Sequence, residues 1–467
     1  MDAMRSVLNY MTTFLVLAVL SLPAKADTLV DIYELAVNND AKLKTAKANY
    51  NANIETEKQA RSALLPQVNA SASYEDSDAE TNSQFAFGAS TIGDTDSETE
   101  TYSISLKQPL FDLPAWFSFK RGQSISEQAE AQLASDQQSL VIRTAEAYFD
   151  VLRSLENLAA SKAEERATQQ QLEQSQQRFE VGLIAITDVH EARAVYDRTV
   201  VQRLTDEGNL GTSYEAVSVL TGQDHNNLWL LSKDFPVTDP DPIIRDDWVQ
   251  FALKNNYQLK AAMAGAQASQ QNARSKKMGH LPKLTASYTY SEFDQDGVFK
   301  SGGTSTITGN QSDEGVIGLS LTMPLFTGGR ISSERRQAYE QFNAARETEV
   351  DVRRTIVQST RSLHIAVMTD VQRVKARKQA IVSTQSALEA TQAGYEVGTR
   401  NIVDVLDARR SLYASIRDHA NSRYDYVINL LKLKQQAGTL SPQDIYDLDK
   451  WLRSPEPPSA QDYEKTQ

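Results

Sequence analysis

The chain contains the same pattern twice. The segment RFEVGLIAITDVHEAR at 178–193 returns as GYEVGTRNIVDVLDAR at 394–409, and the pair Leu65-Pro66 returns as Leu281-Pro282. Both pairs are separated by 216 residues. A fixed period held over most of a chain indicates a duplicated supersecondary unit. The sequence therefore predicts two similar copies that lie side by side.

The two copies are expected at 27–240 and 241–450, between two end segments. Residues 1–26 combine Arg5, a short apolar stretch and the small-residue site Ala24-Lys25-Ala26, which is typical of a signal peptide. A buried amino-terminal helix is the alternative, but it would not require charge and small residues at these places. Residues 451–467 are polar and rich in proline, which predicts a disordered tail.

Composition excludes several classes of protein. The absence of cysteine excludes disulfides and thiolate metal sites. The net charge of −13 argues against a nucleic-acid surface. The mature chain has no apolar stretch of about 18 residues, so any entry into a membrane must occur as strands. The five histidines are scattered, and no nucleophile motif or phosphate loop is present, so we expect no enzyme, no cofactor and no metal.

Four segments alternate strictly between apolar and small polar residues, which predicts β-strands with one apolar face. Their apolar members are Val68, Ala70, Ala72 and Tyr74; Tyr102, Ile104 and Leu106; Leu284, Ala286, Tyr288 and Tyr290; and Ile317, Leu319, Leu321 and Met323. The polar segments 77–99 and 294–313 are expected to be long hairpin loops. A half-buried soluble sheet is one interpretation. The signal peptide, the strand length near ten residues and the tyrosines favour an outer-membrane barrel.

The rest of the chain has helical character. Two long helices are expected at about 115–179 and 332–395, each ending at a Val-Gly turn from which a second helix returns, at 186–220 and 401–436. Apolar residues repeat every seven positions along both long helices, and this heptad seam predicts coiled-coil packing. Its members are Val367, Val374, Ile381, Leu388 and Tyr395 in copy two, and Val151, Leu158, Leu172 and Phe179 in copy one, where Glu165 interrupts it. Two earlier helices, 30–62 and 247–278, should end at the Leu-Pro pairs.

Four strands are too few to close a barrel. The smallest transmembrane barrels have about eight strands, and an open sheet edge in lipid leaves backbone groups without hydrogen bonds. The chain must therefore oligomerise, as a dimer with eight strands or a trimer with twelve. Small inward-facing Ser, Thr and Ala favour the wider pore of a trimer. The sequence alone does not decide between a dimer and a trimer.

These segments resemble one known family. LFTGGR at 325–330, the two tip segments and the order of elements are similar to TolC-type outer-membrane factors over essentially the whole mature chain. The resemblance implies an α+β membrane protein: a homotrimer with a 12-stranded outer-membrane β-barrel continuous with a long α-helical coiled-coil barrel in the periplasm. It implies an exit duct for drugs or type I secreted proteins, in contact with outer-membrane lipid. A periplasmic adaptor and an inner-membrane RND, ABC or MFS transporter would be its partners. A periplasmic adaptor or helical scaffold is the alternative.

The resemblance also assigns a gate at the helical tips. The positions that match the family's gate are Thr187 and Asp188 in copy one and Tyr395 and Arg400 in copy two. An Arg–carboxylate pair with a Tyr hydroxyl is directional and breakable, which suits a gate. The alternative is that Thr187 and Asp188 only cap the start of a helix.

Two further sets of residues follow from the same match. Asp404 and Asp407, spaced i and i+3, lie on one helix face and would form carboxylate rings that select cations. The alternative for such a pair is a solvated helix face. The turns at Gly182 and Gly398 are expected to dock the adaptor or the pump.

Overall fold

The computed structural model describes residues 27–84, 90–301 and 303–454. The predicted signal peptide, 1–26, lies outside the described residues. The chain divides into two compact units. The helical unit is formed by the described parts of Met1–Ala48, Leu133–Leu259 and Arg353–Gln467, and the sheet unit by Asn49–Gln132 and Lys260–Val352. Each unit takes segments from both copies, so the units do not coincide with the copies.

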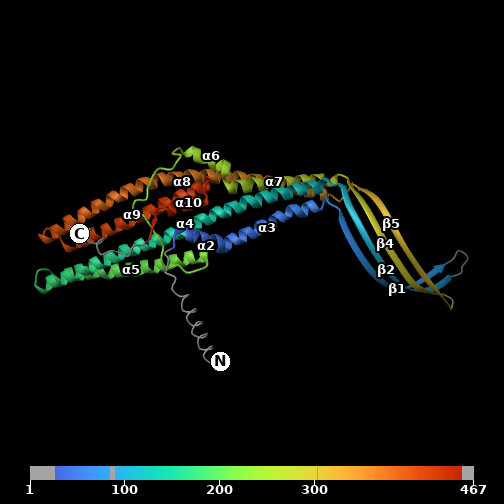
Figure 1. Cartoon of the computed structure of the whole chain (residues 1–467), viewed down its shortest axis with the longest axis horizontal. Coiled ribbons are helices and arrows are strands. Elements are labelled where there is room, and N and C mark those ends of the chain that lie inside the picture. Colours follow the sequence, from blue (N-terminus) through green and yellow to red (C-terminus); the bar gives the residue numbers. More distant parts are fainter. Residues whose placement is uncertain (1–26, 85–89, 302, 455–467) are drawn as a thin grey trace, which may run out of the picture. The chain divides into compact units, whose positions relative to one another are not determined.

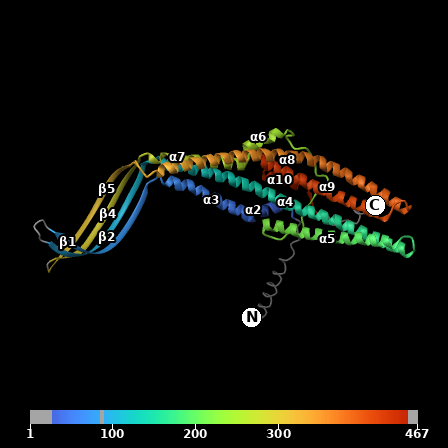
Figure 2. The same cartoon turned by 180° about the vertical axis from the view of Figure 1, so that it is seen from behind.

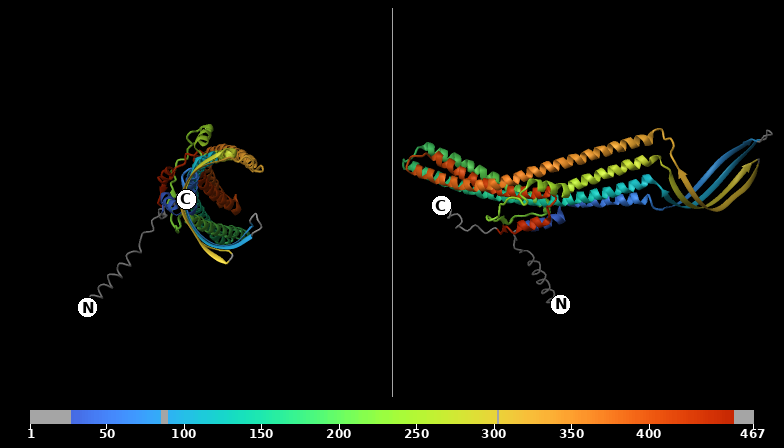
Figure 3. Two further views of the ribbon diagram at one scale, coloured as in Figure 1. Left: turned by 90° about the vertical axis from the view of Figure 1, so that its right-hand side faces the viewer. Right: turned by 90° about the horizontal axis from the view of Figure 1, so that it is seen from above.

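The sheet unit contains four antiparallel strands in the order β1-β2-β4-β5 (Figure 1). The strands are β1 (Gln67–Gln84), β2 (Ser90–Phe111), β4 (Lys283–Ser301) and β5 (Thr304–Thr322). Each copy supplies one hairpin, and pairing of β2 with β4 joins the two hairpins into one sheet that bends along its strands (Figure 3). The prediction of four strands in each chain is confirmed.

The prediction of long hairpin loops at 77–99 and 294–313 is wrong. Ser77 pairs with Ser97, and Asp294 pairs with Gln311, so the strands continue far into these segments, with β1 reaching Gln84 and β2 beginning at Ser90. The strands have 18 to 22 residues rather than about ten. The reason is that a ladder is held by backbone hydrogen bonds, which polar side chains do not interrupt when they can face water.

One face of the sheet carries a continuous apolar band. Val68, Leu106, Tyr288 and Ile317 lie opposite one another across the four strands, and all four are exposed. The band covers about four alternating positions, which is roughly 20 Å along a strand. The other face is hydroxylated: for example, Ser71 and Ser103 pair across the strands, with their Oγ atoms 2.7 Å apart.

The long helices and their returns are confirmed. Helix α4 (Leu113–Glu180) returns as α5 (Ile186–Thr221), and α8 (Arg330–Glu396) returns as α9 (Ile402–Gln436). The two hairpins of the helical unit lie side by side with their turns at the same end (Figures 1 and 2). Among the described residues, none of the helices combines the length and the apolar character that crossing a bilayer requires.

The two earlier helical segments are interrupted, which the sequence analysis did not predict. Asp40 separates α2 (Leu29–Asn39) from α3 (Ala41–Ser62), and Asn256 separates α6 (Arg245–Asn255) from α7 (Tyr257–Lys277); the 3-10 turn η1 (Met278–His280) follows. Both residues leave the helical conformation, at ψ 118° and 125°, and both side chains accept a hydrogen bond from a backbone N–H of the next helix. Each therefore ends one helix and caps the next.

The two caps differ in charge. Asp40 is buried and pairs with Arg143, whose Nη2 lies 2.6 Å from Asp40 Oδ2. Burial alone would raise the pKa of Asp40, but the hydrogen bonds from Arg143 and from the backbone of Leu43 and Lys42 lower it. In copy two, the neutral Asn256 donates instead to the carbonyl of Gln436, at 2.9 Å.

The core of the helical unit draws on both copies. It includes Tyr148, Phe149 and Leu152 of α4 with Tyr424 and Leu431 of α9. Helix α10 (Pro442–Asp449) adds Ile445, and a two-stranded sheet of β3 (Leu230–Leu231) and β6 (Leu452–Arg453) adds Leu452. The predicted disordered tail, 451–467, is therefore wrong in its first residues, because burial of Leu452 holds them in the core. Residues 455–467 lie outside the described residues.

Glycine at position 438 is expected to be essential for the helical unit. Gly438 has φ +70°, and a Cβ there would lie 2.5 Å from the carbonyl carbon of Asn255. Its counterpart Gly222 has φ +75°, but its Cβ would meet nothing closer than 3.8 Å. Gly222→Ala should cost about 1 kcal/mol for the left-handed conformation. Gly438→Ala should cost roughly 1–3 kcal/mol more. Thermal unfolding followed by far-UV circular dichroism in detergent measures both, and equal melting temperatures would contradict the packing described.

Candidate functional site

The two hairpin tips share one turn geometry. Gly182 and Gly398 have φ +78° and +76°. The N–H of Leu183 donates to the carbonyl of Arg178 at 2.8 Å, and the N–H of Thr399 donates to that of Gly394 at 2.9 Å. These bonds form the Schellman motif that ends a helix at a glycine. The predicted Val-Gly turns are thus found where the sequence places them.

Apolar side chains surround both turns. Val181, Leu183 and Val397 are 71%, 72% and 75% exposed. These tips therefore present apolar surface that the chain itself does not cover.

Each hairpin has its own apolar seam near the tip. Leu172 of α4 packs with Val189 and Ala192 of α5. Leu388 of α8 packs with Val405 and Leu412 of α9. In the described residues these two clusters are separate, whereas farther from the tips a single core includes both copies. Glu165, which interrupts the predicted seam of copy one, forms an ion pair with Arg203 of α5 at 2.7 Å.

Polar contacts connect the two hairpins along the half of α9 that is nearer the tip. Three side chains of α9 reach α4: Arg409 donates to the carbonyl of Ala167, Tyr413 donates to the carbonyl of Ala163 at 3.4 Å, and Arg417 pairs with Glu164 at 2.9 Å. Hydrogen bonds of this kind can be exchanged for bonds to water, unlike buried apolar contacts.

Tyr395, one of the predicted gate residues, meets an arginine that the sequence analysis did not consider. The guanidinium carbon of Arg178 lies 5.1 Å from the centre of the Tyr395 ring, which is a cation–π contact between the two copies. The Tyr395 hydroxyl is buried and has no hydrogen-bond partner within the described residues. In the two tip segments, Arg178 of copy one occupies the same place as Gly394 of copy two, and this difference could have marked Arg178 for attention. The sequence does not show that Arg178 contacts Tyr395, because that contact depends on the fold.

The other predicted gate residues contact residues of their own hairpin. Arg400 lies 3.9 Å from Asp404, and the Thr187 hydroxyl donates to Asp188 at 3.3 Å. Within the described chain, the structure does not bring Thr187 or Asp188 into contact with Tyr395 or Arg400. The N-cap of α5 is Ala185, which makes no side-chain cap. Thr187 and Asp188 are therefore not the N-cap of this helix.

Asp404 and Asp407 lie on the solvent-exposed face of α9. Their side chains are 37% and 63% exposed, while Ile402 and Val405 on the other face are buried. Asp404 also accepts a hydrogen bond from the backbone of Asn401, within a capping box, and Asp407 lies 3.6 Å from Arg410. The predicted shared face is present, and Asp404 has a capping role in addition.

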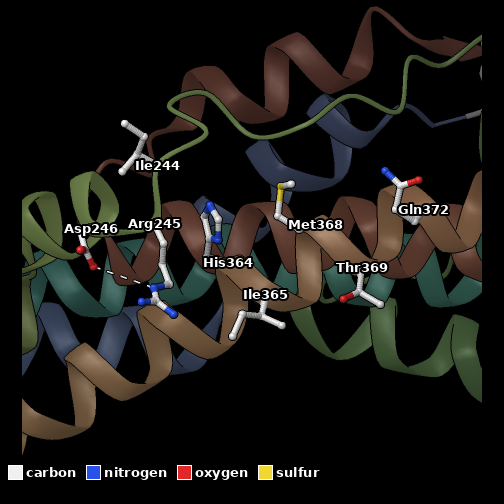
Figure 4. Close-up of a pocket in the computed structure, with 8 residues that line it drawn as sticks. All are labelled: Ile244, Arg245, Asp246, His364, Ile365, Met368, Thr369 and Gln372. Carbon is white, nitrogen blue, oxygen red and sulfur yellow. Dashed lines mark ion pairs between the residues drawn. The ribbon is translucent and has the colours of Figure 1, made fainter.

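A cavity of about 700 Å³ lies away from these residues, between the start of α6 and the middle of α8 (Figure 4). Its wall includes Ile244 and Ile365, both exposed, and His364, whose Nε2 lies 2.9 Å from the carbonyl oxygen of Ile243. No predicted site residue lines it. In the described part of the chain, no group of three or more His, Cys, Asp and Glu residues could hold a metal ion.

Comparison with known proteins identifies the family. A family model described as outer membrane efflux protein matches the chain twice, at 32–223 and 248–439. The chain belongs to the outer membrane efflux protein family. The two matches are offset by 216 residues, the period of the duplication.

Relatives agree with this assignment over nearly full length. The outer membrane protein TolC of Vibrio cholerae is 36% identical over 439 residues, which covers 94% of this chain and 96% of the relative. TolC of Escherichia coli is 34% identical, with coverage of 92% and 86%. A crystal structure of CusC, a protein that forms a transmembrane channel, matches with a TM-score of 0.74 at 15% identity, covering 89% of this chain and 92% of the other.

The chain is thus a TolC-family outer-membrane channel for efflux or secretion, with a helical extension into the periplasm. This function is transport rather than catalysis. It confirms the predicted family, fold and localisation, and it replaces the alternatives of a periplasmic adaptor or a helical scaffold.

The exposed pair Asp404 and Asp407 predicts that multivalent cations block the channel. Asp404→Asn with Asp407→Asn removes both charges but keeps an oxygen for the backbone of Asn401. Block of the reconstituted channel by a trivalent cation should weaken by about tenfold or more, because close carboxylates attract multivalent ions strongly. Asp418→Asn, which removes another exposed carboxylate of α9, is the control. Equal block in the double variant and the control would exclude a carboxylate ring.

Proposed function

We propose that three copies of this chain form one exit duct, with a 12-stranded barrel in the outer membrane and a gate at the hairpin tips. The observation that carries the proposal is the open four-stranded sheet. Its edge strands β1 and β5 each pair on one side only, and its apolar band is exposed. In lipid, unpaired backbone groups cost several kcal/mol each, so neighbouring copies must supply the missing pairing.

The composition of the sheet favours three copies over two. An eight-stranded barrel is filled by its own side chains, whereas a larger barrel encloses water. The face opposite the apolar band carries small hydroxylated residues such as Ser71, Ser103 and Ser291, which suit a wet lumen. Twelve strands from three chains would close the barrel and would also leave a water-filled lumen for these polar side chains.

The number of chains can be measured directly. Protein extracted from outer membranes in detergent should have the mass of three chains by light scattering, after the detergent contribution is subtracted. It should also conduct ions in planar bilayers. A stable monomer, or a dimer that conducts, would overturn the proposed closure.

Thr187, Asp188, Tyr395 and Arg400 are the proposed gate residues. Two features support this role: polar contacts join the two hairpins along the half of α9 nearer the tip, and the Tyr395 hydroxyl is buried with no partner of its own within the described residues. In the trimer, a neighbouring hairpin offers Asp188 and Thr187 as the missing acceptors. A closed tip held by such bonds opens without disturbing the apolar seam of either hairpin.

The turns at Gly182 and Gly398 are the proposed docking points for a periplasmic adaptor, together with an inner-membrane RND, ABC or MFS transporter. Exposed Val181, Leu183 and Val397 support this, because apolar surface at the end of a helical hairpin suits burial against a partner. The cargo, drugs or type I secreted proteins, is selected by the transporter that docks.

The gate predicts a change in conductance. Arg400→Ser with Tyr395→Phe should raise single-channel conductance in planar bilayers by about threefold or more, because a constriction limits the current through a pore. Arg346→Ser is the control: exposed Arg346 also contacts a carboxylate of its own copy, Glu347, and neither residue was assigned to the gate or to the carboxylate rings. If the double variant and the control conduct equally, these residues do not hold the tip closed.

A further inference from the structure

A polar cavity lies between α4 and α5, inside the hairpin of copy one. It has a volume of about 250 Å³. It is lined by Asp150, Arg153, Ser154 and Asn157 of α4 and by Asp206 and Asn209 of α5. None of these residues belongs to the tip gate or to the carboxylate rings, so the cavity has no role in the function proposed above.

Asp206 is the most unusual residue of this cavity. It is only 6% exposed, yet one of its two carboxylate oxygens is unsatisfied. Oδ1 accepts a hydrogen bond from Gln202 Nε2 at 3.1 Å, whereas the buried Oδ2 has no hydrogen-bond partner within the described residues. A buried carboxylate is costly unless hydrogen bonds or an opposite charge compensate it. The cavity therefore contains an acceptor that requires a partner.

The side chains next to Asp206 contribute several oxygen atoms but only one positive charge. Asn157 Oδ1 is also buried without a hydrogen-bond partner. Asp150 brings a second carboxylate, and Ser154 brings a hydroxyl. Arg153 is the cation of the wall: its Nη2 pairs with Asp425 of α9 at 2.8 Å, and its Nε is 3.7 Å from Asp150 and makes no hydrogen bond within the described residues. The charge on Asp206 is thus not neutralised by an ion pair with Arg153.

Copy two provides an internal reference for the same place. The counterpart of Asp206 is Ser422, whose hydroxyl donates to the carbonyl of His419 at 2.7 Å. The buried carboxylate of copy two is Asp370, which accepts hydrogen bonds from Arg373 at 2.9 Å and from Asn429 at 2.7 Å. The chain satisfies this carboxylate with its own side chains. Copy one has no such donors at Asp206 Oδ2.

We propose that this cavity binds a hard divalent cation of the Ca²⁺ class through Asp206, Asn157 and Asp150. All the candidate ligands are oxygen atoms, which Ca²⁺ accepts in irregular sets of six to eight, including water. Zn²⁺ prefers the imidazole and thiolate ligands that this cavity lacks. With two carboxylates and a nearby Arg, the site is expected to be weak, with a dissociation constant of roughly 10⁻⁴–10⁻³ M.

A cation here would join α4 to α5 within copy one. The same hairpin has a charged residue, Glu165, where its heptad seam is interrupted. Bound Ca²⁺ would therefore stabilise the hairpin that has the more polar seam, without involving the tips.

Calcium binding by the whole protein tests the site. Full-length protein is extracted in detergent, treated with EDTA and titrated with CaCl₂, with MgCl₂ and ZnCl₂ as comparisons, by calorimetry and thermal unfolding. The wild type should bind one Ca²⁺ per chain at this site and melt at a higher temperature with Ca²⁺. Asp206→Asn should lose both effects. Asp197→Asn, which removes an exposed carboxylate from the same helix, should keep them.

A second variant, designed to bind Ca²⁺ more tightly, keeps the test valid if Asp206→Asn fails to fold. Asn157→Asp keeps the size of the side chain and adds a third carboxylate, so Ca²⁺ should bind about tenfold more tightly. If Asp206→Asn binds as much Ca²⁺ as the wild type, or if Asn157→Asp leaves the affinity unchanged, the cavity contains water only and the proposal is overturned. Neither result depends on the gate, which the conductance of the Arg400 and Tyr395 variants tests separately.

Discussion

The rest of the structure depends on the hydrogen-bonding requirement of the sheet. A four-stranded sheet with an apolar band must lie in lipid, but its edges then have no water to satisfy their N–H and C=O groups. The chain meets part of the requirement itself, because β2 of copy one pairs with β4 of copy two along their length. The two outer edges remain, which is why the proposed function requires neighbouring copies.

Duplication gave this chain two similar backbones whose side chains have diverged. Asp40 with Arg143 in copy one corresponds to the neutral Asn256 in copy two, although both cap a helix at the same place. At the tips, Arg178 of copy one corresponds to Gly394, and a Cβ at 394 would lie 2.8 Å from the side chain of Arg400. Equivalent positions thus have different structural roles: one copy contributes the guanidinium that stacks on Tyr395, and the other leaves space for the side chain of Arg400.

Features that depend on local conformation were predictable from the sequence. A glycine that ends a helix and a Leu-Pro pair that begins a strand act through their own backbone, so the turns at Gly182 and Gly398 were correctly placed. The common face of Asp404 and Asp407 follows from helical spacing alone. The helix breaks at Asp40 and Asn256 were missed, because the composition around them is fully compatible with a helix.

Other features depend on contacts between distant segments. Strand pairing beyond Ser77 is held by backbone partners, so the lack of aliphatic residues was a misleading signal. The order of residues 451–454 depends on burial of Leu452, and the role of Arg178 depends on the approach of α8 to α4. Alternation and heptad spacing describe one element at a time, and they contain no information on such neighbours.

The continuation of the strands past the apolar band has a consequence for the outer surface of the cell. In the proposed barrel, the paired segments beyond Tyr74 and Tyr290 would stand above the lipid headgroups as a stiff collar rather than as flexible loops. Carboxylates such as Asp76, Glu98 and Asp296 lie on the outer face of this collar, because they alternate in step with the apolar residues of the same strands. Cargo would therefore be released at a fixed height above the bilayer, and the outward-facing carboxylates would keep the collar in water.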